Sequence, residues 1–173
     1  YRAFSLISHT KSSFLFILSD KIGSEFLCFM GLCVITVALL ILSTLGVHTS
    51  LVVFLVGSIT MSVGMAMFQS PNTSLIMSTV ERSQTGVAGS INALARNLGM
   101  VFGISLSTVL LYNIMSGHLG YTVMGFAEGE EQVFVAAMHW VYRFMALISA
   151  VGAVLTGLRW KNRKEHETEA RGA

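Results

Sequence analysis

The sequence predicts an all-α integral membrane protein with four transmembrane helices, or five if residues 1–18 end a preceding span. No Asp, Glu, Lys or Arg occurs between Glu25 and Glu81, and a lipid-facing charge is costly to insert into a bilayer. Charged residues make up 12% of the chain, against roughly 25% in soluble domains, and hydrophobic residues make up 53%. The charges are bunched between long apolar runs, which indicates several spans and not one buried core.

The first span is predicted at residues 26–46, an apolar run that follows residues 1–25, which we interpret as the end of a preceding span and a cytoplasmic loop. A spanning helix needs about 20 apolar residues, and this run would measure about 32 Å as a helix. Its cysteines, Cys28 and Cys33, have neither disulfide nor metal spacing, so we interpret them as packing residues. Residues 1–18 are either the inner end of another span or an interfacial segment.

The second span is predicted at residues 51–79, a length that requires tilting, kinking or protrusion. At 100° per residue its small residues share one face with its proline: Gly57, Thr60, Gly64 and Pro71. Small residues let another backbone approach closely. Because Pro71 has no N–H, it should kink the helix. Gln69 and Asn72 can satisfy the freed backbone groups, and we expect them to line a transport path.

The third span, predicted at residues 85–115, carries a polar stripe. Within roughly 80° of one another lie small and polar residues: Gly89, Asn92, Arg96, Gly99, Gly103 and Ser107. Polar side chains are costly against lipid, so this stripe should face protein or water. We expect four of its residues to line a transport path or substrate cavity: Asn92, Arg96, Gly99 and Gly103. Arg96 lies about 18 Å along the helix from Gln84. In one interpretation Arg96 lines a cavity and contacts a substrate or a carboxylate of another helix. In the other it pairs with backbone carbonyls and only holds the helices together.

The fourth span is predicted at residues 133–158, followed by a hydrophilic tail at 159–173. Ser149, Ala153 and Gly157 form a small-residue ladder that indicates helix packing. Arg143 lies near the outer end of this span beside aromatic residues. We interpret it as an arginine that extends to the lipid headgroups, in preference to a role in transport.

The charges of the connecting segments predict the orientation. Lys and Arg occur at 20–21, at 81–82 and in the tail, whereas the segments 47–50 and 116–132 contain neither. The positive-inside rule places the first group in the cytoplasm. The prediction is a multi-pass protein of the cell membrane with a cytoplasmic carboxy-terminus.

No catalytic motif is present in the sequence, which lacks HExxH, GxSxG and a phosphate-binding glycine loop. We therefore expect no enzyme, catalytic residue, metal or cofactor, and no nucleic-acid partner. The predicted spans contain no Asp or Glu. If transport is coupled to protons, the titrating group lies in another part of the protein.

Two runs resemble signatures of the major facilitator superfamily. Residues 18–23 read LSDKIG, similar to the cytoplasmic loop signature G-x-L-[SA]-D-[RK]-x-G-[RK]-[RK], although Ser24 and Glu25 replace its closing basic pair. Residues 85–90 read TGVAGS and precede a run similar to the penultimate helix of the 14-span drug/proton antiporter branch: Asn92, Arg96, Gly99 and Gly103. The Gly64 to Pro71 spacing also resembles a helix late in that fold.

The resemblance implies the carboxy-terminal helices of a larger bundle that works by alternating access. Asp20, Lys21 and Gly23 would belong to its cytoplasmic gate loop. Its activity would be export of drugs or other amphipathic molecules against inward proton flow. Because the family needs twelve to fourteen helices, the partners would be the lipid bilayer, the missing amino-terminal part of the transporter, a small-molecule substrate and protons.

Two other functions compete with this interpretation. A small four-span scaffold or assembly protein would explain the small-residue ladders equally well. It would explain the polar stripe and Pro71 less naturally. A major-facilitator transporter of another metabolite, such as a sugar, is the third hypothesis.

Overall fold

The computed structural model describes residues 24–47, 49–125 and 129–172, and the side chains of these residues as far as 161. It contains the helices α2 (Ser24–Leu42), α3 (Leu51–Ser78), α4 (Thr85–Leu119) and α5 (Glu131–Gly172), with the short 3-10 helix η1 (Arg82–Gln84) before α4. Four stretches are long and apolar enough to cross a membrane: Ser24–Leu42, Leu51–Ser78, Arg82–Leu119 and Glu131–Lys161. Every regular element in the described part is helical, which confirms the predicted fold class.

The connections explain where the helices end. The Ser50 hydroxyl caps α3 by accepting a hydrogen bond from the Val52 amide at 3.3 Å. Gly120, with φ of 75°, closes α4 in the left-handed conformation that glycine adopts without strain. Beyond the expected fourth span, α5 continues as helix to Gly172.

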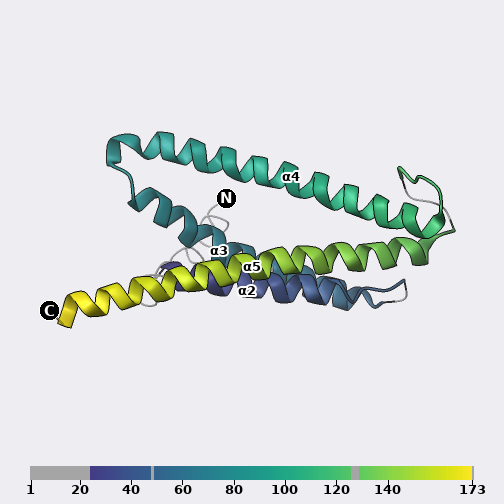
Figure 1. The fold of residues 1–173 in the computed structure, drawn as a ribbon, viewed down its shortest axis with the longest axis horizontal. Helices are drawn as coiled ribbons and strands as arrows, with labels where there is room; N and C mark the ends of the chain where they lie inside the picture. The colour runs from purple at the N-terminus through teal and green to yellow at the C-terminus, as the bar shows by residue number, and fades with distance from the viewer. Residues whose placement is uncertain (1–23, 48, 126–128, 173) are drawn as a thin grey trace, which may run out of the picture.

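The helices α2, α3 and α5 lie together, whereas α4 converges with α5 toward the connection that joins them (Figure 1). At that end a small apolar cluster forms around buried Met115, Val123 and Ala137. It joins the last turns of α4 to the first turns of α5. Farther back along α4, residues 94–102 are exposed.

The α2–α3 contact depends on two glycines that bring the backbones together. A Cβ atom added to Gly31 would lie 2.7 Å from the Phe68 nitrogen, and one added to Gly64 would lie 2.9 Å from the Ile35 nitrogen. Both distances are shorter than carbon–nitrogen contacts allow, so no larger residue fits without a backbone shift. Along α3 the buried residues are Gly57, Gly64 and Pro71.

Between α2 and α5 there are polar contacts at three levels. Arg159 approaches Glu25 at 3.8 Å beside the Phe26–Trp160 ring contact. At mid-height the Thr36 and Ser149 hydroxyls lie 3.0 Å apart. At the opposite end the His139 ring hydrogen-bonds the Leu45 carbonyl oxygen. These contacts hold α5 along the full length of α2.

The small-residue ladder of α5, which the sequence indicated only as a packing surface, faces α2. Ala153 is buried, and a Cβ atom on Gly157 would lie 3.1 Å from the Phe29 ring.

Glu25, which the sequence placed just before the first span, lies in the first turn of α2. One carboxylate therefore does belong to this spanning helix, at its end and beside Arg159.

Gly64→Ala should destabilise the chain, because its Cβ would push against backbone atoms of α2 that cannot turn away. Overpacking of this kind costs about 1–3 kcal/mol. The measurement is the thermal unfolding temperature of the purified protein in detergent. Gly117→Ala is the matched control, since a Cβ there meets nothing within 4 Å. An equal unfolding temperature for both variants would contradict the close α2–α3 approach.

The Thr36–Ser149 contact should contribute a small, measurable coupling energy. Both hydroxyls also lie near the Leu32 carbonyl oxygen, at 2.9 and 3.4 Å. Interhelical hydrogen bonds in membranes average about 0.6 kcal/mol in double-mutant cycles. A cycle of Thr36→Val and Ser149→Ala, followed by unfolding in detergent, should give a coupling of this size. Strict additivity of the two substitutions would exclude the contact.

Candidate transport site

A cavity of about 410 Å³ lies among α2, α3 and α4. Sites for small molecules in proteins commonly occupy about 300–1,000 Å³. Three helices supply its lining residues: Leu32, Ile35, Met65, Phe68, Gln69, Asn72, Thr73, Asn92 and Arg96. Of the six residues that the sequence assigned to a transport path, four line this cavity, namely Gln69, Asn72, Asn92 and Arg96, whereas Gly99 and Gly103 do not.

The α3 wall of the cavity is built around Pro71. The helix continues through Pro71 to Ser78, and Pro71 itself is buried. Proline has no N–H for the carbonyl one turn earlier. Nearby, the Thr73 hydroxyl donates a hydrogen bond of 2.9 Å to the Gln69 carbonyl oxygen. This bond supports the backbone of the turn that presents the Gln69 and Asn72 side chains to the cavity.

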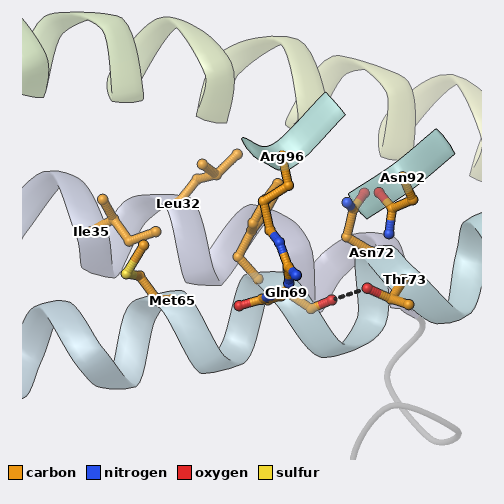
Figure 2. Close-up of a pocket in the computed structure, with 9 residues that line it drawn as sticks. Leu32, Ile35, Met65, Gln69, Asn72, Thr73, Asn92 and Arg96 are labelled. Carbon is orange, nitrogen blue, oxygen red and sulfur yellow. Dashed lines mark hydrogen bonds between the residues drawn. The ribbon is translucent and has the colours of Figure 1, made fainter. Parts of the chain in front are cut away.

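The α4 wall is formed by Asn92 and Arg96, one helical turn apart on the same face. In Figure 2 the Arg96 side chain extends from α4 toward Gln69 on α3, and Asn92 approaches Asn72. The only hydrogen bond between the residues drawn joins Thr73 to Gln69. The three carboxamides and the guanidinium group thus meet in the cavity with their side-chain hydrogen-bonding groups still available to a ligand.

The cavity is polar at one end and apolar at the other. Leu32 and Ile35 of α2 lie with Met65 at one end in Figure 2, whereas Asn72 and Asn92 lie at the other end, with Arg96 between them. Among the residues that the structure describes, no carboxylate lines the cavity. Within the described part of the chain, Arg159 forms an ion pair with Glu25 at the end of α2. An amphipathic molecule with oxygen atoms at one end would match this arrangement.

The other residues singled out by the sequence lie outside the cavity. A Cβ atom on Gly99 or Gly103 would meet nothing within 4 Å, and one on Gly89 would lie 3.5 Å from the Met77 methyl group. Gly64 lies at the α2–α3 crossing. The gate-loop residues Asp20, Lys21 and Gly23 fall outside the described residues.

Sequence reasoning missed the apolar wall and the partner of Gly64. Leu32, Ile35 and Phe68 line the cavity, yet residues of the same types are exposed elsewhere in the described chain. Gly31 is the α2 residue that meets Gly64, and one feature of the sequence could have identified it. It lies seven residues before Ala38, which is also buried. That spacing places the two small residues on one helix face.

Comparison with known proteins gives the family. The sequence model of the family described as Major Facilitator Superfamily matches residues 3–173. The riboflavin transporter RibZ of Clostridioides difficile (strain 630) is 26% identical over 139 residues, which cover 80% of this chain and 29% of that protein. The chain thus spans less than a third of this relative's length. No solved structure matches the chain.

The family and the relative are transporters, as the sequence predicted, and not enzymes. With nearly its whole length matched, the chain belongs to the major facilitator superfamily.

Proposed function

We propose that the chain is the carboxy-terminal part of a secondary transporter that exports drugs or other amphipathic small molecules in exchange for protons, by alternating access. The observation that carries this proposal is the cavity among α2, α3 and α4, with Asn72 and Asn92 at one end, Arg96 in the middle and apolar side chains at the other end. Such a site binds a molecule that has both an apolar body and polar groups. The amino-terminal part of the transporter would complete the path.

A second candidate substrate class is a metabolite with a polar heterocycle. The relative RibZ is named as a riboflavin transporter, and three carboxamides can both donate to and accept from a heterocycle's edge. Membership in a transporter family favours both candidates over the scaffold hypothesis. Assignment to the 14-span drug/proton antiporter branch remains part of the first proposal.

Proton coupling would need a titrating group outside the cavity described here. Glu25 and Glu131 lie in the first turns of α2 and α5, and neither lines the cavity. We propose that the remaining part of the transporter supplies this group. The gate-loop role of Asp20, Lys21 and Gly23 is likewise a proposal.

Arg96→Ala in the intact transporter should reduce export at least about tenfold, because it removes a hydrogen-bonding partner of the substrate and the one cation among the described residues that line the cavity. Export of riboflavin and of a panel of amphipathic drugs is measured in cells, at equal surface expression. Arg143→Ala is the matched control. Arg143 is exposed on α5 and lies over the Trp140 ring, 5.8 Å from its centroid. Unchanged export by Arg96→Ala would remove Arg96 from the transport mechanism.

The proposed location is the cell membrane, with the carboxy-terminus and the α3–α4 connection in the cytoplasm. In a Cys28→Ala, Cys33→Ala background, Tyr121→Cys should react with an impermeant maleimide added to intact cells. Ser83→Cys should react only after permeabilisation, because it lies in η1 on the opposite side. Labelling of Ser83→Cys in intact cells would reverse the orientation.

A further inference from the structure

We infer that the cavity selects neutral or anionic ligands that carry acceptor oxygens, and that it excludes organic cations. This inference rests on the proposed function and assigns a substrate class to the same site. It follows from the charges and the hydrogen-bond donors and acceptors of the nine described lining residues. It also follows from the separation between the polar and the apolar end of the cavity.

The hydrogen-bonding groups of the cavity are mainly donors. The Arg96 guanidinium has five N–H donors and no acceptor, and the amides of Gln69, Asn72 and Asn92 each add two N–H donors and one acceptor oxygen. A ligand that presents carbonyl, carboxylate or phenolate oxygens satisfies this set. A ligand that presents ammonium groups competes with Arg96 for the few amide oxygens.

The charge of Arg96 has no counter-charge nearby in the described chain. Glu25 lies beside Arg159 at the end of α2, and Glu81 lies in the α3–α4 connection, near Ser83. Ionised side chains at membrane depth require a partner, because the hydrocarbon cannot solvate them. An anionic ligand provides that partner, whereas a cationic ligand adds a second positive charge to the same cavity.

One lining residue favours cations: an aromatic face such as that of Phe68 attracts them. A full positive charge at a similar distance repels a cation more strongly than a ring quadrupole attracts it. The repulsion by Arg96 therefore decides the preference. The apolar wall of Leu32 and Ile35 then takes the hydrocarbon body and orients the oxygens toward α4.

Two dyes with the same xanthene skeleton test this inference in the intact transporter. Fluorescein is anionic and rhodamine 123 is cationic at neutral pH. Export from loaded cells, corrected for cells without the transporter, should favour fluorescein by about tenfold or more, the size expected for a like-charge penalty in a partly hydrated site. Arg96→Gln keeps hydrogen-bonding capacity but loses the charge, so it should reduce this ratio about tenfold. Arg96→Lys and the control Arg143→Gln should preserve it.

Two outcomes would overturn the inference without overturning the proposed function: faster export of rhodamine 123, or an unchanged ratio in Arg96→Gln, including equal loss of both dyes at normal surface expression. The last result would show that Arg96 supports the bundle or pairs with another helix.

If Arg96→Gln does not reach the membrane, competition in the wild type decides: fluorescein must inhibit export of a transported substrate more strongly than rhodamine 123. Export of neither dye, without such competition, also overturns the inference. The proposed function is then judged by Arg96→Ala on riboflavin and the drug panel.

Discussion

Hydrocarbon offers no hydrogen bonds, and this constraint determines which polar groups of the chain remain available for function. Backbone groups are satisfied within the helices, as any lipid-embedded segment requires. Most hydroxyls of the spanning helices are also satisfied locally. Thr60 donates to Val56 at 2.7 Å and Thr108 donates to Ile104 at 2.9 Å, each to a carbonyl oxygen one turn earlier. Asn113 of α4 does the same, donating to Val109. The carboxamides and guanidinium of the cavity differ because they point into shared space and not onto their own helix (Figure 2).

The four helices are not equally constrained by their neighbours. Gly31 and Gly64 bring α2 and α3 into backbone contact, and α5 is held to α2 by contacts at both ends and in the middle. By contrast, α4 is anchored mainly by the cluster around Met115, near its carboxy-terminal end. Its middle exposes large apolar residues: Leu94, Leu98, Met100, Val101 and Phe102. Such a surface is suited to lipid or to further helices of a larger bundle.

The features that sequence could predict are those that depend on a contrast between residue types. Charge-free runs marked the helices, and the rare polar groups Asn92 and Arg96 marked the cavity-facing side of α4. The apolar wall could not be predicted, because a leucine such as Leu32 is equally stable against lipid and against protein. The ion pair of Glu25 with Arg159 was also hidden, since it joins opposite ends of the described chain and depends on which helices become neighbours.

The placement of the cavity gives α3 two roles that follow from one stretch of sequence. Its buried face contacts α2 at Gly64 and also includes Pro71, while Gln69 and Asn72 beside Pro71 line the cavity that α3 shares with α4. One wall of the cavity therefore belongs to a closely packed helix pair, and the opposite wall belongs to α4, the helix with fewer close neighbours. In sequence the two walls are joined by η1, the short connection in which the Gln84 amide donates to the Glu81 carbonyl oxygen at 2.9 Å.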